Sequence, residues 1–135
     1  KSGFAAETFS KMVAALGGPV DFLENRSNYF PRAPVVEDVY PKSEGYVEEI
    51  DTRSIGLAVV EMGGGRKKIE DKIDYSVGFD NLLSLSSYVD INIPIGTIHA
   101  PNKDILNYGK EKLLKAYKLA ERPTQSKDVI IECVT

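Results

Sequence analysis

The hydrophobic pattern at the start of the chain predicts one amphipathic helix and then a connection. Apolar residues recur at spacings of three and four over residues 4–16, which is typical of a single helix face. The Gly-Gly-Pro sequence that follows predicts the helix end, because glycine adopts the left-handed C-terminal conformation and proline blocks continuation. Residues 20–24 are predicted to add one short turn. Residues 25–34 contain two prolines and are predicted to be extended.

The pattern then changes to short segments that are typical of strands. Residues 35–40 and 45–51 are rich in β-branched or aromatic side chains, and a proline-containing turn separates them. Asp51 and Thr52 offer caps for a helix over residues 53–62. Gly56 lies inside this helix and suggests a close contact with another part of the backbone.

Helical signals fade over residues 67–100. Residues 87–100 alternate in part, and Pro94 confines them to a sheet edge or a bend. A last helix is predicted to begin within residues 101–104 and to stop at Arg122 and Pro123. Its apolar stripe is Leu106, Gly109, Leu113, Tyr117 and Ala120. Residues 128–134 are predicted to form a closing apolar strand.

The predicted order is helix, linker, two strands, helix, several strands, helix and strand, which indicates an α+β fold. The sequence contains no internal repeat and no low-complexity tract. A chain of 135 residues can bury a core without metals or disulfides.

Composition narrows the possible partners. The chain carries 17 basic and 20 acidic residues, for a net charge of −3, and the two signs are interleaved. Nucleic acids and anionic membranes are bound by clustered cations, so neither is predicted as a partner. A single cysteine favours a reducing compartment, and no apolar run approaches the ~20 residues that span a bilayer. Because the first residue is Lys1 and the chain opens at a helix cap, we expect a piece of a longer protein.

The sequence Gly63-Gly64-Gly65-Arg66 is the strongest candidate for a ligand-binding motif. A phosphate loop needs backbone N–H groups at the N-terminus of a helix that follows the glycines. Here the predicted helix precedes them, and no Gly-Lys-Ser/Thr sequence is present. The order favours a glycine C-cap and tight turn over a phosphate cradle, with Arg66 paired to Asp74 or to helix C-terminal carbonyls. These five residues are therefore predicted to form a structural motif.

No recognisable catalytic set accompanies this turn. His99 is the only histidine, and alternation places it opposite Ile98, which favours a packed or hydrogen-bonded strand residue over a catalytic base. Cys133 lies in an apolar run and is predicted to be a core residue. One histidine and one cysteine supply no metal cluster, so no metal site is predicted. The carboxylates that could include a catalytic pair are Glu48, Glu49, Asp51, Asp71 and Asp74. Acidic residues are also needed at strand edges and helix caps, which is a sufficient structural reason for them.

Three segments stand in one order along the chain: SGFAAETFSKMVAALGGPVDFLEN, EGYVEEIDTRSIGLAVVEMGGGRKKIEDKIDYSVGF and IGTIHA. Together they resemble the C-terminal part of the pyrimidine-nucleoside phosphorylase family, and within that family the thymidine phosphorylases. The most specific part runs from the Asp-Thr-Arg at residues 51–53, through the triple glycine, to Ile-Asp-Tyr-Ser-Val-Gly at residues 73–78. A triple glycine alone would be a weak signal, whereas this ordered set is specific.

The resemblance implies an enzyme that converts thymidine plus phosphate to thymine and 2-deoxyribose 1-phosphate. It implies a cytoplasmic homodimer that needs no cofactor, with phosphate as a co-substrate and a pyrimidine deoxynucleoside as substrate. The family's catalytic and substrate-binding residues precede the part seen here, so none is assigned to this chain. Its role would be to support the α/β domain that closes over the substrate, and its partner would be the rest of the enzyme.

The resemblance also implies a domain organisation. Residues 1–24 would be the tail of the upstream α/β core, residues 25–34 a linker, and residues 35–135 the C-terminal domain. That domain is expected to form a β-hammerhead-like mixed sheet with flanking helices. The alternative is a non-catalytic barrel-sandwich or carrier-like module, for which Lys67 and Lys68 lack the small or Met neighbours of a modified lysine. A pure assembly domain is a third possibility.

Overall fold

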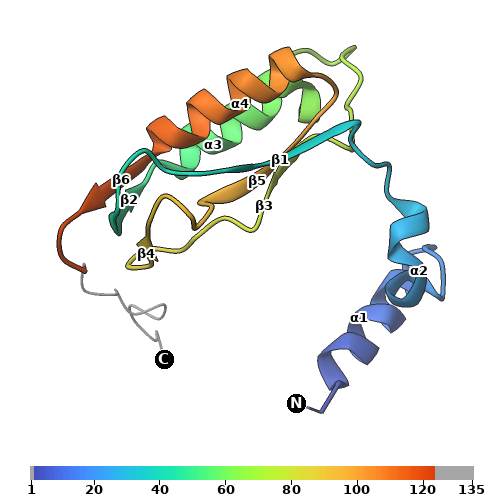
Figure 1. The fold of residues 1–135 in the computed structure, drawn as a ribbon. Helices are drawn as coiled ribbons and strands as arrows, with labels where there is room; N and C mark the ends of the chain where they lie inside the picture. Colours follow the sequence, from blue (N-terminus) through green and yellow to red (C-terminus); the bar gives the residue numbers. More distant parts are fainter. Residues whose placement is uncertain (1, 124–135) are drawn as a thin grey trace, which may run out of the picture. The chain divides into compact units, whose positions relative to one another are not determined.

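The computed structural model describes residues 2–123 of the chain. Contacts divide it into two compact units, with the division between Arg32 and Ala33 (Figure 1). The first unit contains two helices, and the second contains six strands and the remaining helical segments. Helices and strands are thus both present, which confirms the α+β class.

The N-terminal unit is a pair of helices, α1 (Phe4–Ala15) and α2 (Phe22–Tyr29). Helix α1 agrees with the predicted helix, and Gly17 beyond it has a φ of 87°, which suits glycine. The extended conformation predicted for residues 25–34 is wrong in its first half, because α2 runs to Tyr29. A proline restricts only the residue before it, and here that residue is Phe30, which is extended with a φ of −99° and a ψ of 132°.

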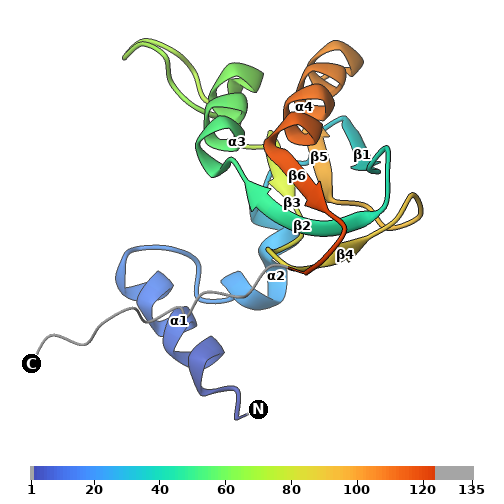
Figure 2. The same cartoon turned by 90° about the vertical axis from the view of Figure 1, so that its left-hand side faces the viewer.

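The second unit contains two three-stranded antiparallel sheets. Sheet A has the order β1-β5-β3 and sheet B the order β4-β2-β6, as the views in Figures 1 and 2 show. Every strand pair among residues 33–123 is antiparallel, so the single mixed sheet that was predicted is wrong for this part of the chain. The bounds are β1 Val35–Val39, β2 Gly45–Ile50, β3 Gly78–Asp80, β4 Tyr88–Val89, β5 Gly96–Ala100 and β6 Tyr117–Ala120.

Helix α4 (Lys103–Ala116) packs on β1 and β5 of sheet A, and α3 (Thr52–Val59) packs beside α4. Both helices begin with the side-chain caps that their sequences favour. Asp51 accepts a hydrogen bond from the Ser54 amide at 2.9 Å, and Asn102 accepts one from the Ile105 amide at 3.0 Å. The largest fully buried side chains of the core come from strands, from α4 and from a loop: Val39, Val47, Val89, Ile95, Ile98 and Leu113.

The close backbone approach lies at a different glycine from the one predicted. Gly56 has no atom within 4 Å of the position where a Cβ would stand, and it is exposed. At Gly109 on α4, by contrast, a Cβ would lie 2.8 Å from Sδ of Met62. The small residue in α4 therefore makes room for Met62, which is buried under it.

Residues 87–100 agree with one predicted alternative, and the last helix is shorter than predicted. The 87–100 segment bends at Pro94: it forms β4, a turn that contains Pro94, and then β5, which is the central strand of sheet A and not an edge. The last helix ends at Ala116, and Tyr117 begins β6, which pairs with β2 so that Ala120 stands opposite Tyr46. The strand predicted over residues 128–134 lies outside the described residues.

Candidate functional site

The triple glycine closes a helical segment. Helix α3 continues into a short wider turn, η1 (Val60–Gly64), in which Gly63 has the left-handed φ of 104°. The Gly63 carbonyl accepts a hydrogen bond from the Asp74 amide at 2.9 Å, which returns the chain to the helix end. A Cβ on Gly64 would lie 2.7 Å from Val59 Cγ1 and 3.2 Å from the Val77 carbonyl. The glycines thus provide the positive φ and the close packing of a helix C-terminus, as the element order predicted.

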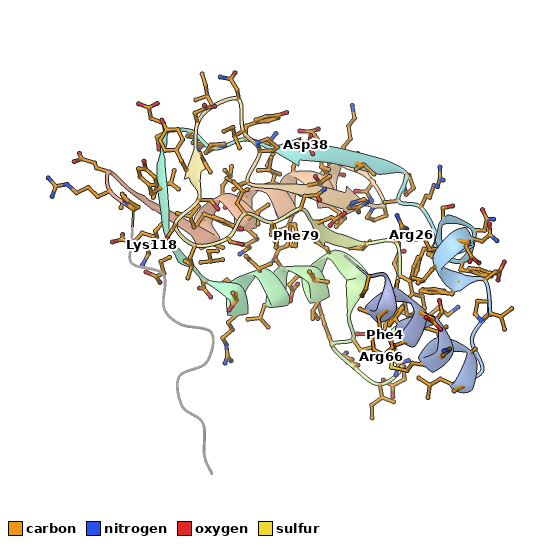
Figure 3. All side chains as sticks on the ribbon, turned by 90° about the horizontal axis from the view of Figure 1, so that it is seen from below. Phe4, Arg26, Asp38, Arg66, Phe79 and Lys118 are labelled. Carbon is orange, nitrogen blue, oxygen red and sulfur yellow. The ribbon has the colours of Figure 1, made fainter. Side chains whose placement is uncertain are left out.

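Arg66 does not pair with Asp74, which was one of the two kinds of partner predicted for it. Arg66 is exposed on the loop after the helix, where Figure 3 labels it. It forms no ion pair among residues 2–123. The Asp74 carboxylate instead accepts hydrogen bonds from the Ser76 hydroxyl at 2.6 Å and the Ser76 amide at 2.9 Å. These bonds hold the pKa of Asp74 below its ordinary value. The Asp74 carboxylate therefore stabilises its own turn through Ser76.

The residues after the glycines form an ordered loop rather than a ligand cradle. The Asp71 carboxylate accepts hydrogen bonds from the amides of Lys67 and Lys68, at 3.0 and 2.9 Å. The Lys67 ammonium pairs with Glu61 of η1 at 2.5 Å. The amides that a phosphate would need at Lys67 and Lys68 are thus already bonded within the chain.

His99 lies on β5, the central strand of sheet A. Ile98 is buried toward α4 and His99 is half-buried on the other face, so the predicted alternation is confirmed. Val36 and Gly78 stand opposite His99 on the neighbouring strands. No nucleophile faces His99 across these strands, and within residues 2–123 the His99 imidazole makes no hydrogen bond. Cys133 lies outside the described residues.

Beside His99, a polar network joins the strands of sheet A. The Thr97 hydroxyl donates a hydrogen bond to Asp38 of β1 at 2.7 Å and accepts one from the Asn81 amide group at 3.5 Å. Asp38 is labelled in Figure 3 on β1. Sequence reasoning missed this network, because Asp38 and Thr97 come from two strands and Asn81 directly follows a third, and the sequence does not reveal the order of these strands.

The other acidic candidates have structural partners or lie exposed. Asp51 caps α3, and hydrogen bonds from the Ser54 hydroxyl and amide lower its pKa. Glu49 on β2 pairs with Lys118 on β6 at 2.7 Å, and Glu48 is exposed. Among residues 2–123 no group of three or more histidine, cysteine or carboxylate side chains is placed to hold a metal ion.

A surface cavity of about 370 Å³ lies between α4, β6 and the β1–β2 turn. Its floor includes Ile95 and Tyr117, and Lys42 and Lys115 stand among its lining residues. The Tyr117 hydroxyl donates to the Leu83 carbonyl at 2.8 Å, and burial raises its pKa. Two of its charged lining residues, Lys115 and Glu111, form an ion pair at 2.6 Å.

The structure also bears on the carrier-like alternative. Carrier modules present their modified lysine at the tip of a β-hairpin, whereas Lys67 and Lys68 lie on a loop between η1 and β3. Their backbone amides are tied to Asp71, which fixes a different local geometry. No helix in the part of the chain that the structure describes is long and apolar enough to cross a membrane.

These observations define an α+β domain whose most distinctive motif is a structural turn and whose described part presents no catalytic set. Residues 46–120 match the pyrimidine nucleoside phosphorylase C-terminal domain. The match covers more than half of the 135 residues and contains the glycine turn. The chain belongs to this family, which supports the predicted relation to the C-terminal portion of a nucleoside phosphorylase. The family places the chain in nucleoside metabolism, as part of a transferase-type enzyme.

Proposed function

We propose that this chain is the C-terminal part of a thymidine phosphorylase. In that reaction a phosphate oxygen replaces the base at C1′ of the deoxyribose. The N-glycosidic bond breaks, and the base leaves as thymine after taking up a proton. The observation that carries the proposal is the family match over residues 46–120. The thymidine assignment is supported by the sequence resemblance of the Asp-Thr-Arg, triple-glycine and Ile-Asp-Tyr-Ser-Val-Gly segments within this range.

The role of this chain is structural support for the α/β domain that closes over the nucleoside. The side chains considered for catalysis or substrate binding have structural roles or positions instead. Asp51 and Asp74 accept hydrogen bonds from local backbone amides, and Arg66 lies on a loop after a helix end. Phosphate and nucleoside then bind to residues of the preceding part of the enzyme, which acts as a homodimer in the cytoplasm without a cofactor. The unit from residue 35 onward contributes a hammerhead-like scaffold.

The N-terminal unit supports the same proposal. Helix α1 has no buried residue, and Phe4 and Leu16 expose 71% and 81% of their surfaces. Apolar side chains along one helix face normally pack against protein. Residues 1–24 are therefore the tail of the upstream α/β core, and α1 packs there in the complete enzyme.

The test is release of thymine from thymidine and phosphate. We would compare the 135-residue chain, the full-length enzyme, the enzyme truncated before residue 35, and a mixture of the truncated enzyme with the missing part. We expect turnover by the full-length enzyme, none by the 135-residue chain, and reduced thermal stability in the truncated enzyme. Turnover by the chain alone near the full-length rate would refute the support role.

Two measurements separate the alternatives. Uridine in place of thymidine as substrate of the full-length enzyme tests the pyrimidine nucleoside that it prefers, and faster cleavage of uridine would contradict the thymidine assignment. Intact mass measurement of protein from its native host tests the carrier-like module, because a carrier would contain a modified lysine. An unmodified mass together with thymidine turnover is the expected result.

A further inference from the structure

The cavity between α4, β6 and the β1–β2 turn has the size and the apolar floor of a small-molecule site. Its volume of about 370 Å³ falls within the range of about 300–1,000 Å³ that is usual for ligand pockets. The apolar residues that line it are Pro41, Ile95, Leu114, Tyr117 and Leu119. Ile95 and Tyr117 also belong to the buried core, so the floor of the cavity is part of the packed interior.

Hydrogen bonds around the cavity hold this floor in place. The Ile95 amide donates to the Val39 carbonyl at 2.8 Å, and the Tyr117 hydroxyl donates to the Leu83 carbonyl at 2.8 Å. Figure 2 shows β6 continuing directly from the end of α4, so these two walls belong to one continuous segment. A cavity that is already formed requires little loss of conformational entropy when a ligand binds.

Two polar side chains without partners come from the turn that borders the cavity. The Lys42 ammonium and the Ser43 hydroxyl line the cavity and form no hydrogen bond or ion pair among residues 2–123. Glu44, the carboxylate next to them in the chain, is not a lining residue and accepts a hydrogen bond from the Tyr88 hydroxyl at 3.0 Å. Both free groups can donate hydrogen bonds, and a carboxylate can accept one at each oxygen.

The charged lining residues favour a ligand with one negative charge. They are Lys42, Lys115 and Glu111, so one positive charge is in excess. Lys115 and Glu111 form an ion pair in which both side chains are exposed, and this leaves Lys42 as the cation without a partner. A monoanion balances that charge, whereas a neutral ligand leaves it unpaired and a cation is repelled.

We propose that this cavity is a binding site for a small organic monoanion, namely a carboxylate that carries an apolar ring. The ring packs on Ile95, Leu114 and Leu119, and the carboxylate accepts hydrogen bonds from Lys42 and Ser43. Thymidine is uncharged and inorganic phosphate has no apolar part, so neither substrate of the proposed reaction has this chemistry. The inference therefore depends on the cavity and not on the proposed function.

The test is an NMR titration of the 135-residue chain with its Ile, Leu and Val methyl groups labelled. The probe is naphthalene-2-carboxylate, and naphthalene-2-carboxamide is the neutral probe with the same ring. We expect saturable shifts of the methyl signals of Ile95, Leu114 and Leu119, with a Kd for the carboxylate below about 1 mM. The amide should bind roughly fivefold more weakly, because it cannot pair with Lys42.

A matched pair of variants tests the role of Lys42. Lys42→Glu should weaken binding of the carboxylate roughly tenfold, because repulsion replaces attraction, and it should leave binding of the amide unchanged. Lys72→Glu is the control, since Lys72 is exposed, forms no ion pair among residues 2–123 and does not line the cavity. It changes the net charge by the same amount and should leave both affinities unchanged.

Several results would overturn the proposal. They are an absence of saturable shifts at the cavity methyl groups, equal affinity for the two probes, and equal weakening by Lys72→Glu. Shifts confined to the exposed apolar residues of α1 would show adventitious binding of the ring and would also refute it. The other possible occupant of the cavity is another part of the enzyme. In that case the full-length enzyme would not bind the carboxylate, and the ligand site would be refuted.

Discussion

Replacement of Gly63 by Ala tests whether the triple glycine is a helix C-cap. Gly63 has a φ of 104° and a ψ of 0°, and no atom lies within 4 Å of a Cβ placed on it. The substitution therefore changes backbone strain without a steric clash. Left-handed conformations cost a non-glycine residue about 1–2 kcal/mol. The smaller entropy of the unfolded alanine variant offsets about 0.4–1 kcal/mol of this cost.

The net expectation is a loss of about 1 kcal/mol in the free energy of unfolding, since the strain exceeds the offset. For a domain of this size that corresponds to a fall in Tm of roughly 4–8 °C. Gly56→Ala is the matched control, because Gly56 lies inside α3, is exposed and has free space around it. There alanine should stabilise the chain by about 0.5–1 kcal/mol, because it is the better helix former.

Thermal and urea unfolding, followed by circular dichroism, would measure both variants. Opposite signs for Gly63→Ala and Gly56→Ala are the expected result. Gly63→Asn should recover part of the loss, because asparagine tolerates the left-handed region better than alanine. If Gly63→Ala raised the Tm as Gly56→Ala does, the C-cap interpretation of the turn would be refuted.

Three further predictions concern the core, a cap and the division between the units. Leu113→Ala should lower the free energy of unfolding by about 2–5 kcal/mol, because Leu113 is fully buried; a urea midpoint equal to that of the wild type would contradict the described core. The pKa of Asp51 is lowered in the folded state, so its helix cap stabilises the chain at pH values above the unfolded-state pKa. This stabilisation is lost as the pH falls through the folded-state pKa. The Tm difference between wild type and Asp51→Ala should therefore disappear in acid. A difference that persists at pH 2 would refute that linkage. Trypsin should cut first after Arg32, where the extended connection follows α2, and earlier cleavage within α3 would count against this assignment.

Local signals in the sequence predicted the end of α1, both ends of the α3–η1 segment, and strands β1 and β2. The Gly-Gly-Pro sequence after α1, the Asp51 cap and the glycine C-cap at Gly63 all depend on residues within one turn of the element that they end. Such signals are physically local, because they satisfy backbone groups of the same helix terminus. They could therefore be recognised without knowledge of the tertiary structure.

The errors arose where distant segments decide the local conformation. Tyr117 and Ala120 continue the apolar spacing of α4, but the open edge of β2 offers them backbone hydrogen bonds, and they form β6 instead. Asp74 was one of the two partners predicted for Arg66, but the Asp74 carboxylate accepts its hydrogen bonds from Ser76, which is only two residues away. The polar network around Thr97 could not be predicted from the sequence, because the order of the strands depends on the whole sheet.

The register of β2 and β6 has a consequence for how this domain can be moved between proteins. Tyr46 and Ala120 stand opposite each other in the ladder, and they are also the first and last residues of the family match. The chain thus enters and leaves the matched segment at neighbouring points, which is the arrangement that tolerates insertion into a host loop. A cassette of residues 46–120 would nevertheless leave β5 without β1 and expose a bare strand edge. A segment inserted into another protein should therefore start near residue 33 and include β1, so that β5 keeps its partner strand.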